Sequence, residues 1–227
     1  ILGSIFNYMA EKIPDHIICD GKVILDSLKK GLRQRATTVL NGIKIDDLSR
    51  EKEAGLRTRQ ELGIPANAYV IGNMARITPW KGQEFLLRAF IEYTRQNKNA
   101  YLMLVGSSMF DNDKYYKNLK QLVFKNDLWD RVLMPGYRSD LKNIFSAMDL
   151  FVYPSVEKDT SPLSLMSAIS SGLPVAMQNI DSLKEITDFC PAVDVFDPGD
   201  RENLISLMKK YVDKGIRDVN GRKNREA

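Results

Sequence analysis

Short runs of β-branched and aromatic residues alternate along this chain with stretches of helical period. The apolar runs predict six strands, at Tyr69–Met74, Ala100–Val105, Arg131–Met134, Leu150–Tyr153, Pro174–Met177 and Val193–Phe196. The stretches of helical period predict helices at Gln83–Arg95, Asp113–Phe124, Asp140–Ala147, Ser161–Ser170, Ser182–Thr187 and Arg201–Tyr211. Strands that alternate with helices form βαβ units, so the pattern predicts a parallel sheet covered by helices on both faces.

The fold class expected from this alternation is α/β, a doubly wound, Rossmann-like sheet of about six strands. In such a sheet the ligand binds beyond the carboxyl ends of the strands. Residues that directly follow a strand are therefore the first candidates for a functional site.

A shorter unit precedes this sheet. Residues 16–20 are strand-like, residues 21–32 helix-like and residues 37–40 strand-like again, which predicts a short βαβ unit. A turn at Asn41-Gly42 and a polar stretch follow, and a helix is expected from Glu51 to Leu62. We therefore expect two parts, residues 1–45 and residues 46–227.

Composition narrows the class of protein. The chain has 227 residues, is 44% hydrophobic and 27% charged, and carries a formal net charge of +4, which fits a globular protein with an anionic ligand. The excess of positive charge is too small to predict a nucleic-acid partner. The charged stretches at residues 50–59 and 214–227 read as solvated helix faces.

Few residues suit metal or redox chemistry. Cys19 and Cys190 have no metal-site or redox spacing, and the single His16 has no ligand-like neighbours in sequence. The scarcity of cysteine favours a reducing compartment, the cytoplasm, and no apolar run approaches the roughly 20 residues that a membrane span needs. Because the chain starts at Ile1, we expect a fragment of a longer protein.

Two cations follow the first strand of the main sheet. Arg76 comes two residues after that strand and Lys81 five residues later, with Trp80 between them. A guanidinium and an ammonium in one loop suit a diphosphate, but the residues alone favour equally a pair of solvated loop charges. Trp80 is either a lid over apolar surface or a wall against the ligand.

Glycines follow the next two strands. Gly106 follows the expected strand Ala100–Val105, and Gly136 follows the expected strand Arg131–Met134. Glycine at a strand end allows close approach of a nucleotide to the backbone, although it is also common turn punctuation. Neither position belongs to a GxGxxG fingerprint or to a GxxxxGK phosphate loop, which disfavours oxidoreductases and nucleoside triphosphatases.

A helix start lies in residues 159–175. Ser161-Pro162 is a helix-start signal, because serine can accept a hydrogen bond from a free backbone N–H and proline at the first helical position leaves none unpaired. The amides of Leu163 and Ser164 would then face open space and, with the helix dipole, form an anion site. Every helix has such a start, so this signal needs its context.

The context is a series of six motifs: NGI (41–43), ARITPWKG (75–82), LVGSS (104–108), MPGYRSDLKNIFSAMDLFVYPS (134–155), SAISSGLPVA (167–176) and FDPGD (196–200). In this order and spacing they resemble the C-terminal half of the group 1 retaining glycosyltransferases of GT-B fold. The resemblance covers roughly residues 37–211. It implies that this half binds a nucleoside diphosphate sugar and that residues 1–45 are the tail of the N-terminal acceptor domain plus a linker.

The resemblance assigns roles to the strand-end residues. It implies that Arg76 and Lys81 bind the diphosphate and stabilise it as it leaves. Gly106, Gly136 and Tyr137 would lie near the nucleoside. The remaining donor contacts would come from the turn and helix start, namely Thr160, Ser161, Leu163 and Ser164.

The resemblance also shows an irregularity. Relatives usually carry two glutamates eight positions apart, the first touching the donor sugar and the second the ribose. In this chain those positions are Asp159 and Ser167. Glu157 could replace the first glutamate if the loop is longer. Ser167 is either a weaker ribose ligand or a neutral helix position that faces solvent.

The implied reaction is sugar transfer to an acceptor hydroxyl with retention, in bacterial polysaccharide or lipopolysaccharide synthesis. No metal and no cofactor are expected, since the nucleoside diphosphate sugar is a substrate. The acceptor would be a glycan or a lipid-linked glycan, and the whole protein could associate peripherally with the inner face of the membrane. The alternatives are a catalytically impaired nucleotide-sugar-binding domain, for which Ser167 argues, and a scaffold for protein interaction.

Overall fold

The computed structural model describes residues 12, 14–108, 113–156 and 159–226. Six parallel strands form the main sheet in the order β5-β4-β3-β6-β7-β8. They span Tyr69–Met74 (β3), Ala100–Val105 (β4), Val132–Gly136 (β5), Leu150–Tyr153 (β6), Val175–Gln178 (β7) and Asp194–Phe196 (β8). The doubly wound α/β class is thus confirmed, and the expected strands differ from these bounds by two residues at most.

Side chains alternate between the two faces of the sheet. In β3, Ile71 packs into the core with helices α5, α6 and α10, whereas Val70 packs into the core with α7, α8 and α9. The first group spans Gln83–Tyr93 (α5), Asp113–Lys125 (α6) and Arg201–Lys210 (α10), and the second spans Leu141–Ala147 (α7), Leu163–Ser170 (α8) and Lys184–Phe189 (α9). Because strand side chains alternate with period two, one apolar run supplies both cores.

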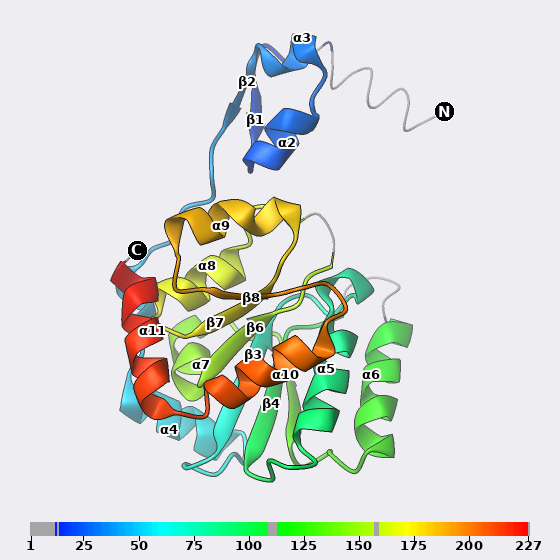
Figure 1. Cartoon of the computed structure of the whole chain (residues 1–227), viewed down its shortest axis with the longest axis vertical. Coiled ribbons are helices and arrows are strands. Elements are labelled where there is room, and N and C mark those ends of the chain that lie inside the picture. Colours follow the sequence, from blue (N-terminus) through cyan, green and yellow to red (C-terminus); the bar gives the residue numbers. More distant parts are fainter. Residues whose placement is uncertain (1–11, 13, 109–112, 157–158, 227) are drawn as a thin grey trace.

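The strand order places β3 and β6 side by side at the centre of the sheet. From β3 the chain continues outward to β4 and β5, and from β6 it continues outward in the opposite direction to β7 and β8 (Figure 1). The loops that follow β3 and β6 therefore diverge. This divergence opens a crevice at the carboxyl ends of the strands, where ligands bind in sheets of this kind.

Two charged helices each pack one side on the domain. In α4 (Lys52–Glu61), Arg59 is only 9% exposed and donates to the Ala147 carbonyl oxygen at 3.0 Å and to Asp149 Oδ2 at 2.8 Å. In α11 (Lys214–Glu226), a Cβ on Gly221 would lie 2.2 Å from the Gly172 carbonyl oxygen. The outward sides of α4 and α11 are solvated as predicted, and only their inward sides pack on the domain.

A two-stranded parallel sheet precedes the main one. It pairs β1 (Ile17–Cys19) with β2 (Ala36–Thr38) and stands apart from the main sheet at one end of the molecule (Figure 1). The single helix expected over residues 21–32 is wrong, because the backbone is extended at Leu28 (ψ 147°) and splits it into α2 (Lys22–Ser27) and α3 (Lys30–Arg33). The division at residue 45 remains a prediction.

No helix in the described part of the chain is long and apolar enough to cross a membrane.

Candidate functional site

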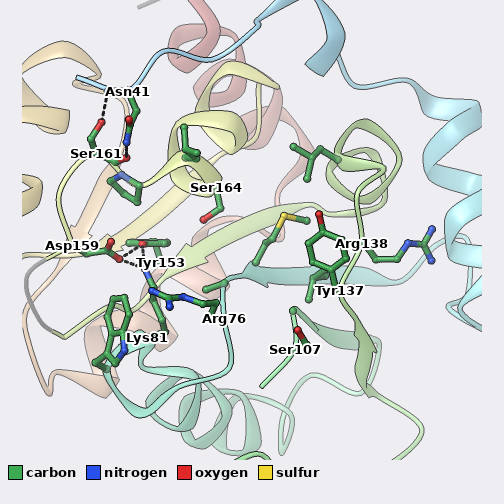
Figure 2. A pocket seen from close by; sticks show the side chains of 18 of the residues that line it. Asn41, Arg76, Lys81, Ser107, Tyr137, Arg138, Tyr153, Asp159, Ser161 and Ser164 are labelled. Atoms are coloured by element: carbon green, nitrogen blue, oxygen red, sulfur yellow. Dashed lines mark hydrogen bonds and ion pairs between the residues drawn. The ribbon is translucent and has the colours of Figure 1, made fainter. Parts of the chain in front are cut away.

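A cavity of about 660 Å³ opens at the carboxyl ends of the central strands (Figure 2). Its walls come from the loops after β3, β4, β5 and β6, from the start of α8 and from the segment that precedes the main domain. The lining residues are Asn41, Met74, Ala75, Arg76, Trp80, Lys81, Val105, Gly106, Ser107, Tyr137, Arg138, Ser139, Leu141, Tyr153, Asp159, Thr160, Ser161, Pro162, Leu163 and Ser164. The topology thus brings separate sequence motifs to one crevice.

Most of the candidate residues line this cavity. They are Arg76, Lys81, Gly106, Tyr137, Asp159, Thr160, Ser161, Leu163 and Ser164. Gly136 and Ser167 are not among its lining residues. Ser167 is only 4% exposed, so its interpretation as a solvent-facing position is wrong. Glu157 lies outside the described residues.

Lys81 and Asp159 form an ion pair in the floor of the cavity. Their side chains are only 10% and 12% exposed. Lys81 Nζ also donates to the Tyr153 hydroxyl at 2.8 Å, and that hydroxyl donates to Asp159 Oδ2. The ammonium is therefore not the solvated loop charge that one interpretation of the sequence allowed.

Burial acts on the titrating groups of this network. Burial lowers the pKa of Lys81, and the hydrogen bond from Lys81 to Asp159 opposes that change. Burial also raises the pKa of Tyr153, and the negative charge of Asp159 raises it further. Tyr153 is therefore neutral, and burial outweighs the Asp159 carboxylate at Lys81, so the pKa of Lys81 is lowered overall.

Arg76 differs from Lys81, because it is exposed at the mouth of the cavity. Its guanidinium lies 5.4 Å from the centre of the Trp80 ring, and the Lys81 ammonium lies 4.2 Å from the same ring. Trp80 is thus a wall of the cavity that contacts both cations. Figure 2 shows Arg76 beside Lys81 and Asp159. Two cations and one carboxylate leave a net positive charge on this side.

The loop around these cations depends on close backbone contacts. Gly82 has a φ of +70°, and a Cβ there would lie 1.9 Å from the Pro154 carbonyl oxygen. Gly106 has a φ of +141°, and a Cβ there would lie 1.9 Å from the Ala75 carbonyl oxygen. These glycines let the loops after β3, β4 and β6 touch one another, which sets the positions of the cations.

Ser161 does not cap α8. The helix begins at Leu163 with Pro162 as its N-cap, and no side chain makes a capping hydrogen bond. The Ser161 hydroxyl instead accepts the Asn41 N–H at 2.9 Å, and the Asn41 side-chain amide donates to the Ser161 carbonyl oxygen at 2.9 Å. The expected serine cap is therefore wrong. The leading N–H groups of α8 still have no acceptor within the helix, as in any first turn.

Tyr137 and Arg138 lie on the opposite side of the cavity from Asp159 (Figure 2). Tyr137 is 76% exposed and free to stack on a flat ligand. The Arg138 guanidinium points away from the cavity (Figure 2), because it donates to Asp140 at 2.7 Å and to Glu61 at 2.6 Å. These bonds raise the pKa of Arg138, and they assign it to the frame of the loop rather than to an anion.

The Arg138–Asp140 pair predicts an acid-sensitive step in stability. The hydrogen bond from Arg138 lowers the pKa of Asp140 from 3.8 to about 2. The stabilisation is thus present above pH 4 and is lost as the pH falls toward 2. Since the Asp140 side chain is 32% exposed, we expect Asp140→Asn to lower the free energy of unfolding by about 1 kcal/mol at pH 7. Urea unfolding at several pH values checks this, and a mutant whose deficit is unchanged at pH 2 would contradict it.

Several cavity residues carried no functional assignment from the sequence, among them Asn41, Ser107, Tyr153, Arg138 and Ser139. Tyr153 could have been predicted, since it is the last residue of a central strand, at the carboxyl edge of the sheet where the ligand is expected. Asn41 could not, because a turn dipeptide says nothing about a partner 120 residues away.

No group of His, Cys, Asp or Glu in the described ranges is arranged to hold a metal ion. The side chains that line the cavity offer cations, hydroxyls, one carboxylate and aromatic rings, and the backbone adds the start of α8. This set suits an anionic, partly aromatic ligand with hydroxyl groups.

The sequence matches the family model described as "Glycosyl transferases group 1" over residues 56–226. Among curated proteins, it is 27% identical over 170 residues to the UDP-Gal:alpha-D-GlcNAc-diphosphoundecaprenol alpha-1,3-galactosyltransferase of Escherichia coli, covering 74% of this chain and 41% of that protein. It is 26% identical to the O-antigen biosynthesis glycosyltransferase WclY of Escherichia coli, covering 82% of this chain and 48% of that protein. The chain thus spans less than half the length of these two relatives.

Solved structures show the same fold. The structure of HepE from Anabaena in complex with UDP and glucose superposes with a TM-score of 0.85 at 21% identity, covering 96% of this chain and 59% of that chain. A C-terminal domain of a group 1 family protein, LpcC from Francisella tularensis, superposes with a TM-score of 0.71 at 19% identity, covering 82% of this chain and 95% of that chain.

Proposed function

Since this chain belongs to the glycosyl transferases group 1 family, we propose that its cavity binds a nucleoside diphosphate sugar and presents the sugar for transfer to an acceptor hydroxyl. One observation carries the proposal. Two cations, Arg76 and Lys81, and the start of α8 converge on a single cavity at the switch point of the sheet. Convergent positive charge at that place suits a diphosphate.

The roles follow from the positions of the side chains. Arg76, exposed at the mouth, grips phosphate oxygens, and Lys81 in the floor reaches the same group. Tyr137 on the opposite side stacks on the base, and Gly106 borders the nucleoside. Asp159, 12% exposed, offers a carboxylate to the sugar hydroxyls. A structural neighbour, HepE from Anabaena, was solved in complex with UDP and glucose, which supports this class of ligand.

In the proposed reaction the bond between the anomeric carbon and the diphosphate oxygen breaks, and a bond from that carbon to the acceptor oxygen forms. The diphosphate leaves with the electron pair and takes up the proton that the acceptor hydroxyl gives up. Arg76, Lys81 and the first amides of α8 stabilise the charge that builds up on the leaving group. Retention of the anomeric configuration, and independence from metals and cofactors, are part of this proposal.

The whole protein would use a further domain for the acceptor. Two relatives act in O-antigen synthesis or on a diphosphoundecaprenol-linked sugar, according to their names. We therefore place this chain in bacterial polysaccharide or lipopolysaccharide synthesis, with a glycan or lipid-linked acceptor. We propose a cytoplasmic location because the cysteines in the described residues are free thiols. We propose association with the inner face of the membrane because the acceptor could be lipid-linked.

A second candidate is a domain that binds the nucleotide sugar without catalysing transfer. The observation that favours it is the position of Ser167, which is buried and is not among the cavity-lining residues. This candidate predicts nucleotide binding of normal strength but no transfer by the full-length protein. A transfer assay on the full-length protein separates the two candidates, and in an enzyme Asp159→Asn should lower turnover more than it lowers nucleotide affinity.

The proposal is tested by a thermal-shift and titration screen of uridine, guanosine, adenosine and cytidine diphosphates, with and without sugar. We expect one of them to raise the melting temperature, and Arg76→Ala to weaken its binding by about 1–3 kcal/mol, the usual range for a charged hydrogen bond. Arg95→Ala is the matched control, because it removes an exposed arginine that is not among the cavity-lining residues. Binding to none of the nucleotides would refute the proposed function.

A further inference from the structure

A buried tyrosine joins the two charged groups in the cavity floor. Tyr153 is 1% exposed at the end of β6, and its hydroxyl accepts from Lys81 Nζ at 2.8 Å while it donates to Asp159 Oδ2. Figure 2 shows Tyr153 between Lys81 and Asp159. The hydroxyl has one proton, so this single arrangement satisfies both neighbours at once.

We propose that Tyr153 is a positioning residue, whose hydroxyl holds the Lys81 ammonium and the Asp159 carboxylate in the places from which they bind the donor diphosphate and the donor sugar. This inference rests on the proposed function, and it adds a residue whose hydroxyl is already engaged by Lys81 and Asp159. Its effect passes through the two charged side chains.

The first step concerns the ammonium. Lys81 has three N–H groups, of which one reaches the Tyr153 hydroxyl and one reaches Asp159 Oδ2. The Trp80 and Tyr153 rings lie 4.2 Å and 5.3 Å from Nζ and limit its movement further. With two N–H groups fixed, the third has a defined direction. A lysine held in this way loses less rotamer freedom when a phosphate arrives.

The second step concerns the carboxylate. All the side-chain donors that reach Asp159 in the described structure, from Lys81, Tyr153 and Ser155, go to the same oxygen, Oδ2. Ser155 Oγ lies 3.0 Å from that oxygen and 3.2 Å from the Trp80 carbonyl oxygen, and its one proton serves only one of them. Tyr153 is therefore the steady hydroxyl donor to Oδ2, which leaves Oδ1 for a sugar hydroxyl.

The ring of Tyr153 has a separate task from its hydroxyl. It packs in the core nearly parallel to Phe151, with ring centroids 6.3 Å apart and planes at 17°. Phenylalanine at this position keeps the ring and removes only the oxygen. Tyr153→Phe therefore tests the hydroxyl without opening a cavity in the core.

The chain supplies a matched control in Tyr211. This tyrosine is fully buried, accepts from Asn220 Nδ2 at 2.7 Å and donates to Asp194 Oδ2 at 2.5 Å. Its hydroxyl thus bridges a nitrogen donor and a carboxylate, as that of Tyr153 does, but Tyr211 is not among the cavity-lining residues. Tyr211→Phe reports what the loss of such a bridge does to stability alone.

The experiment is a double-mutant cycle on the affinity for uridine diphosphate, or for whichever nucleoside diphosphate the wild-type chain binds. NMR chemical-shift titration measures the affinity of each variant. We expect Tyr153→Phe to weaken binding about five- to tenfold in the wild-type chain and less than about twofold in the Lys81→Met background, because the hydroxyl acts through Lys81. Tyr211→Phe should leave the affinity unchanged in both backgrounds.

Three outcomes overturn the inference. Equal weakening by Tyr153→Phe in both backgrounds would give the hydroxyl a structural role only. Weakening by Tyr211→Phe as large as that by Tyr153→Phe would indicate a general loss of stability. Unchanged affinity of Tyr153→Phe would remove the role of Tyr153 while the proposed function stood, since the wild-type chain would still bind the nucleotide; a wild-type chain that binds none would refute the proposed function itself.

Discussion

Replacing Lys81 with methionine is expected to lower the free energy of unfolding by about 3 kcal/mol, because removing one member of a buried ion pair leaves the other charge without its partner. The partner is Asp159, whose side chain is 12% exposed. Urea unfolding of Lys81→Met beside the wild-type chain measures this loss. Methionine keeps most of the length of the side chain, so the effect reports the charge rather than a cavity.

Binding should fall with stability in the same variant. Since Lys81 is one of the two cations proposed to hold the diphosphate, we expect Lys81→Met to weaken nucleoside diphosphate binding by about 1–3 kcal/mol. Lys114 is the control, because it is exposed and its replacement by methionine should change neither the free energy of unfolding nor nucleoside diphosphate binding.

The double variant Lys81→Met with Asp159→Asn separates the two effects. Asparagine removes the orphaned charge, so we expect most of the lost stability to return while nucleotide affinity stays low. A double variant as unstable as Lys81→Met alone would show that Lys81 stabilises the fold by packing instead. A double variant that binds nucleotide as the wild type does would rule out Lys81 as a phosphate ligand.

Replacing Gly82 with alanine is expected to cost about 3 kcal/mol of unfolding free energy. A side chain at φ +70° costs about 1 kcal/mol by itself. The new Cβ would also lie 1.9 Å from the Pro154 carbonyl oxygen, and forcing the two loops apart adds about 2 kcal/mol. Because Gly82 follows Lys81 directly, the displacement should also weaken nucleotide binding.

Gly63→Ala is the matched control for this prediction. Gly63 has nearly the same φ, +71°, but no atom lies within 4 Å of the position that its Cβ would take. Its substitution should therefore cost only about 1 kcal/mol, the contribution of the left-handed backbone. Equal losses in unfolding midpoint for the two alanine variants would show that the approach of Gly82 to Pro154 is not needed.

The alternation of apolar runs and helical stretches was sufficient to predict the main sheet. Residues 69–74 and 100–105 are strands with the expected bounds, because a fully buried parallel strand is apolar throughout and ends where polar residues begin. Helix starts were less predictable. Ser161 carries a strong capping signal, yet its hydroxyl accepts from Asn41, since a distant backbone N–H competes with the helix for the same oxygen.

The cavity was predictable in outline, because the carboxyl ends of parallel strands meet at one edge and the order of the motifs indicated the family. The pairing inside it was not. Lys81 and Asp159 are 78 positions apart, and no local pattern states which carboxylate will neutralise a given lysine. The same holds for Arg138, a cation in a cavity loop that Asp140 and Glu61 hold away from the ligand side.

The sequence by itself determined the fold class, the family and the set of loops that form the cavity, since hydrophobic periodicity and strand-end motifs are local properties of the chain. Only the tertiary structure decided how those loops combine: that Asp159 pairs with Lys81, that Tyr153 joins them, and that Ser167 lies in the core. The physical reason is that charge pairing and burial depend on distances between residues remote in sequence. Those distances are fixed only when the helices pack on the two faces of the sheet. The stretch from residue 159 therefore shows its charge partner only in the folded chain.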